Sequence, residues 1–349
     1  MNARERISAA LQHRPTDHVP VYPILSGVTR HLVGASYHDW ATDPDIYVSA
    51  MEKAARDFDL DCLVTLIDLS VEADAWGIRL IYPESEAAHP DYRACLVQEP
   101  EDYRKVEVVD FRHSARMHFH IEACRRLVAS IGDERPVVAF VFGPLGVLSM
   151  LRGQQDMFMD LIDCPGEVAA AAARVNETLK AYVDALLDTG VAAVMFDTLF
   201  ASRSIMSKAM WDEIEGPLAE DLAHVCHARG VPVMVHNCGN GIYFDVQIRR
   251  MKPAAISFLY PPDDCADLAE TKARYGDQVT LIGAVPPTMV LTATDEEWDA
   301  ICRQQIEVLG RGGGFILATG CEYPANAALG RARRMIEIAR ESTWQTLPG

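Results

Sequence analysis

Eight short apolar segments, spread along the chain and separated by helical patterns, restrict this sequence to a small set of folds. They show no polar alternation, so the strands they form should be buried on both faces. Repeated units of a buried strand and a helix are typical of a parallel α/β sheet, and eight of them indicate a (β/α)₈ barrel. The strands are predicted at residues 19–25, 60–66, 136–142, 192–196, 231–235, 254–259, 280–284 and 314–319.

The segments between these strands carry helical periodicity and helix-end signals, such as Asp43-Pro44 and Gly230. Helices are predicted at 2–12, 44–58, 113–131, 146–163, 166–189, 207–229, 242–250, 264–275, 294–310 and 328–342. Residues 70–110 lack this regularity, so we expect an insertion on the barrel, with short β-like pieces at 76–82 and 93–97.

No linker, repeat or low-complexity tract divides the sequence, so we expect one domain over residues 1–349, a distorted TIM-like barrel. An open doubly wound sheet is the alternative fold. The sequence contains no Gly-x-Gly-x-x-Gly after an early strand, which disfavours that alternative.

Charge and composition narrow the possible partners. The chain has 32 Lys and Arg against 50 Asp and Glu, a net charge of −18, which disfavours binding to nucleic acid. No apolar run is long enough to span a membrane, and the N-terminus lacks a signal-peptide pattern, so we expect a cytoplasmic protein. The nine cysteines are odd in number and scattered, which argues against a disulfide framework.

Two of the predicted strands end in metal-binding residue types. His236 and Cys238 follow the strand at 231–235, and Cys321 follows the strand at 314–319. Side chains two positions apart on a strand point to the same side, and the ends of parallel barrel strands share one rim. One imidazole and two thiolates form a Zn²⁺ ligand set with a fourth position left open, where Cys265 is one alternative ligand.

Further residues at the same rim are candidates for catalysis and binding. Asp197 and Tyr260 end the strands at 192–196 and 254–259, and both are predicted to be catalytic. Gly143, Gly239 and Glu322 are predicted to bind the cofactor, the glycines by allowing close approach of the backbone and Glu322 from behind the metal ligands or in a salt bridge at the rim. Zinc held by thiolates with one open position suits the activation of a substrate thiol.

Three segments, near the start of the chain, in its middle and near its end, resemble sequences of the uroporphyrinogen decarboxylase superfamily. The resemblance covers nearly the whole length and is carried by Asn2–Pro20, by the segment at 231–241 and by Gly312–Pro324. It implies a distorted (β/α)₈ barrel. True decarboxylases of the superfamily have an arginine-rich Met-Arg-Gln-Ala-Gly-Arg-type segment, whereas Ile24–Arg30 here contains one arginine.

His236, Cys238 and Cys321 instead resemble the zinc ligands of the methylcobamide:coenzyme M methyltransferase branch. This resemblance implies zinc-dependent methyl transfer between a corrinoid protein and a small substrate, principally a thiol. The alternatives are corrinoid-linked O-demethylation of methoxylated compounds and, with Asp197 as the polar centre, decarboxylation. The sequence lacks the Asp-x-His-x-x-Gly motif of corrinoid carriers, so the corrinoid is expected on a partner protein.

A methyl-corrinoid carried on a partner protein can react only at an accessible site. We therefore expect a deep, mostly apolar pocket that a corrinoid can approach, walled in part by residues 70–110 and 143–146. The candidate lining residues are Tyr22, Phe200, Tyr260 and Met289.

Overall fold

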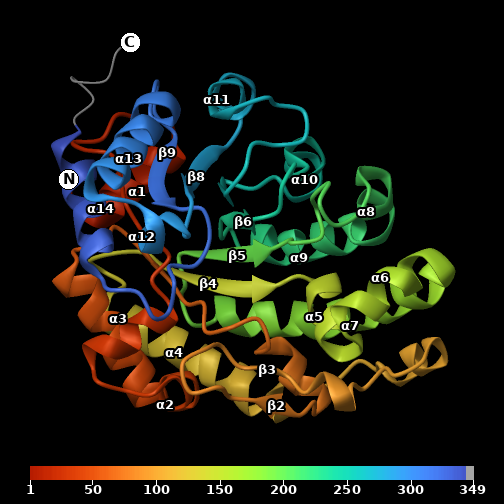
Figure 1. Ribbon diagram of the computed structural model, residues 1–349. Helices are drawn as coiled ribbons and strands as arrows, with labels where there is room; N and C mark the ends of the chain where they lie inside the picture. The colour runs from red at the N-terminus through yellow and green to blue at the C-terminus, as the bar shows by residue number, and fades with distance from the viewer. Residues whose placement is uncertain (343–349) are drawn as a thin grey trace.

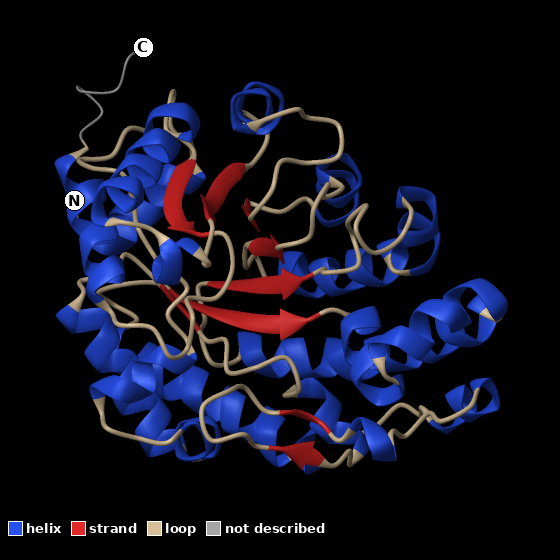
Figure 2. Cartoon of the chain, in the orientation of Figure 1, coloured by secondary structure: helices blue, strands red, loops and turns tan. Residues whose placement is uncertain are grey.

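A curled parallel sheet forms the centre of the molecule, and helices surround it (Figures 1 and 2). The computed structural model describes residues 1–342. The sheet has seven strands in the order β1-β4-β5-β6-β7-β8-β9, and every neighbouring pair is parallel. The strands are β1 (Leu63–Val64), β4 (Val137–Phe142), β5 (Ala193–Asp197), β6 (Val233–Asn237), β7 (Ala255–Phe258), β8 (Thr280–Val285) and β9 (Phe315–Thr319).

The prediction of a regular first strand at 19–25 is wrong. Only Val21 forms a β-bridge, to Leu317 of β9. Pro20 and Pro23 flank this bridge, and proline cannot donate a ladder hydrogen bond. The segment nevertheless joins the two ends of the sheet, because the Tyr22 N–H bonds to the Leu317 carbonyl at 2.9 Å and the Asp61 N–H bonds to the Val21 carbonyl at 3.2 Å.

The strand side chains divide into two apolar clusters, one on each face of the curled sheet. Val138 and Phe140 of β4 belong to the inner cluster, whereas Val137 and Val141 of the same strand belong to the outer one. This division follows from the two-residue period of a strand and explains why the sequence shows no alternation with polar residues. The inner cluster forms the floor beneath the carboxyl ends of the strands.

Most helices lie where the sequence predicts them, but two predicted helices are each broken in two. Gly153, with φ of 96°, separates α5 from α6, and Glu215 separates α8 from α9, where Pro217 stands in the first turn. The α-helices are α1 (Ala3–Leu11), α2 (Tyr37–Thr42), α3 (Pro44–Asp57), α4 (Ala115–Ile131), α5 (Pro144–Arg152), α6 (Gln154–Asp163), α7 (Pro165–Leu187), α8 (Lys208–Ile214), α9 (Gly216–Ala228), α10 (Phe244–Met251), α11 (Leu268–Tyr275), α12 (Met289–Thr292), α13 (Asp295–Leu309) and α14 (Gly330–Glu341). Within residues 1–342, no helix combines the length and apolar character needed to cross a bilayer.

The irregular region at 70–110 contains short elements of its own. β2 (Leu80–Ile81) and β3 (His89–Pro90) pair antiparallel at the edge of the molecule (Figure 2), and 3₁₀ turns surround them. β2 falls within the predicted β-like piece at 76–82. The piece at 93–97 is not a strand, because the Asp91 carboxylate accepts the Arg93 N–H at 3.2 Å and starts a 3₁₀ turn.

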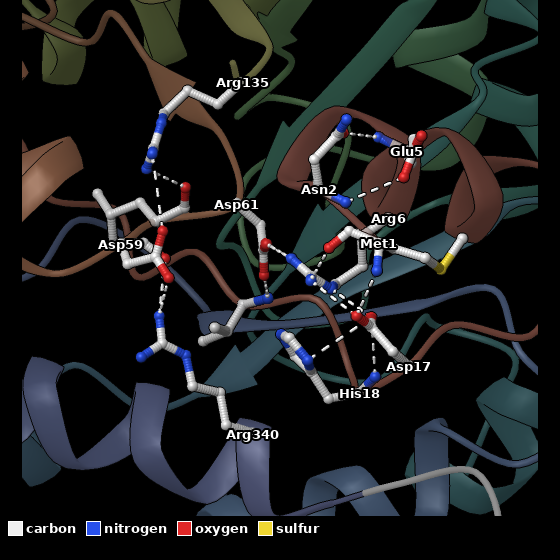
Figure 3. Close-up of polar contacts among 12 residues, drawn as sticks. Met1, Asn2, Glu5, Arg6, Asp17, His18, Asp59, Asp61, Arg135 and Arg340 are labelled. Atoms are coloured by element: carbon white, nitrogen blue, oxygen red, sulfur yellow. Dashed lines mark hydrogen bonds and ion pairs between the residues drawn. The ribbon is translucent and has the colours of Figure 1, made fainter.

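A polar cluster at the amino ends of the strands ties the N-terminal helix to the sheet (Figure 3). The Arg6 guanidinium contacts Asp61 and donates through Nε to Asp17 at 2.7 Å. The second oxygen of Asp61 accepts the Val21 N–H at 2.8 Å. Arg6 and Asp61 are both buried, so this ion pair joins α1, the Val21 bridge and the start of β1 at one point.

Candidate metal centre and cavity

His236, Cys238 and Cys321 converge at the carboxyl ends of β6 and β9. Their ligand atoms all lie within 4.8 Å of one another. His236 is the penultimate residue of β6, Cys238 follows that strand directly, and Cys321 follows β9 after Gly320. Gly320 permits this path, because a Cβ there would lie 2.7 Å from the Leu259 Cα. One imidazole and two thiols at this spacing suit a tetrahedral zinc ion with one open position.

The neighbouring strands orient His236. Asp197 of β5, His236 of β6 and Ser257 of β7 stand side by side in the parallel register. The Ser257 hydroxyl lies 2.9 Å from His236 Nδ1. With Nδ1 held in this way, Nε2 is the nitrogen left for a metal, an arrangement common among metal-binding histidines.

The pKa values of the two thiols are shifted in opposite directions. A hydrogen bond from Cys238 lowers the pKa of the Cys321 thiol well below its ordinary value, and this effect, together with His236, outweighs the opposing effect of burial. The same hydrogen bond, followed by burial, raises the pKa of Cys238. Burial lowers the pKa of His236, but the neighbouring Cys321 and Asp197 reverse that shift and raise it. The centre therefore favours cationic species, as a metal site should.

Two carboxyl groups stand next to this centre. Burial, with a contribution from Cys321, raises the pKa of Asp197 to about 7, although His236 opposes the shift. Burial also raises the pKa of Glu322 to about 7, against the Gly27 N–H, which donates to its Oε1 at 3.3 Å. Asp197 Oδ1 is buried and has no hydrogen-bond partner in the described structure, so it is available to a ligand.

A cavity of about 180 Å³ opens directly above the three ligands. Its wall is mostly apolar, and its polar members are Tyr22, Asp68, Asp197, Glu322 and the three metal-ligand candidates. The apolar lining residues are Ile24, Val64, Leu66, Leu69, Ala87, Phe140, Met195 and Leu199. The structure thus confirms a mostly apolar pocket that reaches Cys321, but the volume of this pocket is too small to admit a corrinoid.

Only some of the other residues predicted to line the pocket or to bind a ligand do line the cavity. Glu322 and Tyr22 line the cavity. Ala87 is the residue of the 70–110 insertion that contributes to its wall. Tyr260 is 43% exposed and lies outside the set of lining residues, as do the buried Phe200 and the partly buried Met289.

The two predicted glycines, Gly143 and Gly239, lie where neighbouring atoms leave no room for a side chain. A Cβ at Gly143 would lie 2.7 Å from the Asp197 carbonyl oxygen, and one at Gly239 would lie 2.3 Å from Ser202 Oγ. Neither glycine lines the cavity. Cys265 is not part of the three-residue ligand group.

Sequence reasoning missed Asp68 and Ser257. Asp68 lines the cavity two residues beyond the predicted strand at 60–66, and its carboxylate is paired with buried Arg116, at 2.9 Å from Nη1. Its position after a strand was a usable signal. Ser257 lies inside a predicted strand, and only the register with β6 shows that it faces His236.

A larger groove, of about 650 Å³, lies between α13 and α14, away from the metal-ligand candidates. Its charged side chains neutralise one another: Arg331 pairs with Asp295 at 2.8 Å, and Arg334 pairs with Asp299. The groove offers no group of potential metal ligands among the residues that the structure describes. The cavity at the strand ends is therefore the candidate active site.

A curled parallel sheet with candidate ligand residues at the carboxyl ends of its strands is the arrangement found in enzymes of the α/β-barrel class. Comparison with known sequences makes this class specific: residues 2–342 match the family described as Uroporphyrinogen decarboxylase (URO-D). The chain belongs to this family.

Relatives with two different activities resemble the chain at similar levels. A uroporphyrinogen decarboxylase of Thioalkalivibrio sulfidiphilus is 25% identical, over 90% of this chain and 91% of the relative. The methylcobamide:CoM methyltransferase MtbA of Methanosarcina acetivorans is 20% identical, over 97% of both chains. The structure of a methyltransferase from Methanosarcina mazei aligns over 98% of both chains with a TM-score of 0.78 and 18% identity, which establishes the shared fold.

Proposed function

We propose that this protein is a zinc-dependent methyltransferase that moves a methyl group between a corrinoid protein and a small substrate. The observation that carries the proposal is the convergence of His236, Cys238 and Cys321 within 4.8 Å at the floor of an apolar cavity. The similarity to a methylcobamide:CoM methyltransferase over nearly the whole chain supports it.

Different residues in or next to the cavity would bind the metal, orient its ligand, exclude water and accept a proton. Cys238, Cys321 and His236 would hold the metal, and Ser257 would keep the imidazole in the ligating orientation. A bound zinc ion would supply Lewis-acid activation of the substrate sulfur or oxygen at neutral pH. The apolar wall keeps water from the reacting atoms, and Asp197 Oδ1 is placed to accept a proton released by a substrate thiol.

The corrinoid would remain on its own protein. A corrin macrocycle is much larger than a cavity of about 180 Å³, so the methyl group would be exchanged at the mouth of the cavity. A thiol is the principal candidate acceptor, and a methoxylated compound acting as methyl donor is the alternative in the reverse direction.

Porphyrinogen decarboxylation fits the cavity poorly. The substrate of that reaction has four pyrrole rings and many carboxylates, whereas this cavity is small and has no Lys or Arg among its described lining residues. The carboxylate of Asp68 is already paired with Arg116. These features favour methyl transfer over decarboxylation for this member of the family.

An assay of methyl transfer tests the proposal directly. The zinc-loaded protein is incubated with methylcobalamin and 2-mercaptoethanol, and with cob(I)alamin and 2-methoxybenzyl alcohol; the cobalamin spectrum and the methylated product are followed. We expect transfer in at least one direction, with loss of activity in Cys238→Ala. Absence of transfer in both directions with stoichiometric zinc bound, together with decarboxylation of a porphyrinogen, would replace this proposal by the decarboxylase alternative.

A further inference from the structure

We propose that the cavity selects a small uncharged substrate, about the size of a single substituted ring, and rejects carboxylates and sulfonates. This inference rests on the proposed function, because it names the substrate class of the same site. It is carried by three properties of the cavity: the absence of an unpaired cation, two buried polar atoms without partners, and the volume.

Within residues 1–342, the cavity lining supplies no unpaired cation to an anionic ligand. Asp68, Asp197 and Glu322 all line it, and no Lys or Arg does so among the residues described. Arg116 lies behind Asp68, and its Nη1 and Nη2 atoms bond to the two oxygens of that carboxylate at 2.9 and 2.5 Å. At the metal centre, two thiolates balance the two charges of a zinc ion. A carboxylate or sulfonate would therefore be buried beside acidic groups without a cationic partner, which is strongly unfavourable.

Two polar atoms in the wall point to a neutral ligand with hydrogen-bonding capacity. The Tyr22 hydroxyl and Asp197 Oδ1 are buried, line the cavity and have no hydrogen-bond partner among the described residues. Buried polar groups are nearly always paired, so an unpaired one facing a cavity indicates a group supplied from outside. A hydroxyl, ether or thiol satisfies these two atoms without introducing a charge.

The volume limits the size of that ligand. An apolar protein cavity of about 150 Å³ accommodates benzene. The cavity here measures about 180 Å³ and is lined by Phe140, Met195 and Leu66 among other apolar residues. One aromatic ring with a small substituent, or a short alkyl thiol, fills such a space, whereas a fused or multi-ring compound does not.

Matched pairs of probes that differ in charge test the inference. The affinity of the zinc-loaded protein is measured by calorimetry for 2-methoxybenzyl alcohol against 2-methoxybenzoate, and for 2-mercaptoethanol against 2-mercaptoethanesulfonate. We expect the neutral member of at least one pair to bind ten times or more tightly than its anionic partner. Equal or tighter binding of the anion in both pairs, or binding of neither member of either pair, would overturn the inference.

Two variants locate the effect in the cavity. Tyr22→Phe removes only the hydroxyl and should weaken binding of the neutral probe severalfold while the zinc content stays unchanged. Leu199 is a partly buried lining residue, so Leu199→Lys introduces a cation that can reach the cavity and should raise the affinity for the anionic probe at least fivefold. Leu199→Met is the matched control and should keep the neutral preference. Unchanged probe affinities in both Tyr22→Phe and Leu199→Lys would show that binding occurs elsewhere.

The two proposals fail in different ways. If neutral probes bind preferentially but no methyl group is exchanged with a cobalamin, the substrate class stands and the methyltransferase assignment falls. If methyl transfer occurs with the anionic thiol or the anionic ether in preference to its neutral partner, the methyltransferase assignment stands and the substrate class falls.

Discussion

Cys238 and Cys321 come from strand ends that are far apart in the sequence, and neither is part of the apolar core. We therefore expect Cys238→Ala or Cys321→Ala to abolish stoichiometric zinc binding, as measured by elemental analysis, while circular dichroism shows an unchanged fold. Cys265→Ala is the matched control, since Cys265 lies outside the ligand group, and it should retain one zinc per chain. Zinc retained at full stoichiometry in the double Cys238/Cys321 variant would contradict the assignment.

Glu72 shows how a single buried carboxyl group links stability to pH. Burial raises its pKa from 4.5 to about 8, and its Oε1 accepts the Phe142 N–H at 3.1 Å. Between these pKa values the folded chain keeps a proton that the unfolded chain releases, so the contribution of Glu72 to stability falls as the pH rises. Glu72→Gln keeps an acceptor oxygen and removes the titration.

We expect the free energy of unfolding of Glu72→Gln, relative to wild type, to rise by about 4 kcal/mol between about pH 4.5 and pH 8.5. Urea unfolding at several pH values measures this difference. A constant difference between the two proteins across that range would show that Glu72 is ionised in the folded state.

At the scale of elements, α1 depends on the buried pair of Arg6 and Asp61. Removing one partner of a buried pair leaves an uncompensated charge, so Arg6→Ala should lower the free energy of unfolding by about 3 kcal/mol in urea titrations. Arg14→Ala, at an exposed arginine of the same N-terminal region, should change it by less than about 0.5 kcal/mol. Similar effects of both substitutions would mean that the cluster in Figure 3 contributes little to stability.

The elements also show what the sequence can and cannot predict. Apolar segments identified seven strands of the sheet, because strands buried on both faces leave a continuous apolar signal. The segment at 19–25 carries the same signal, yet its prolines reduce it to one bridge. His236, Cys238 and Cys321 could be predicted because they end strands. Ser257 and the Arg116 pair with Asp68 could not, since they depend on register and on packing between distant segments.

For the whole molecule, a metal held by β6 and β9 would connect strands that are separated by β7 and β8 in the sheet. A ligand that binds only the folded state stabilises it by about 4 kcal/mol at a thousandfold excess over its Kd. We therefore expect removal of zinc with a chelator to lower the Tm by several degrees in differential scanning calorimetry. Cys321→Ala should show no such response to chelator. An equal shift in the variant would place the stabilising metal elsewhere.

The Arg6 cluster and the metal-ligand candidates lie at opposite edges of the same parallel sheet, because Asp61 precedes β1 whereas His236 and Cys321 stand at the carboxyl ends of β6 and β9. We therefore expect substitutions at one end to leave the interactions of the other intact. Such separation allows new chemistry to be acquired by replacing a few rim residues, without a compensating change in the scaffold. Divergence of activity at 20–25% identity, with the length and fold maintained, is the evolutionary outcome that this arrangement permits.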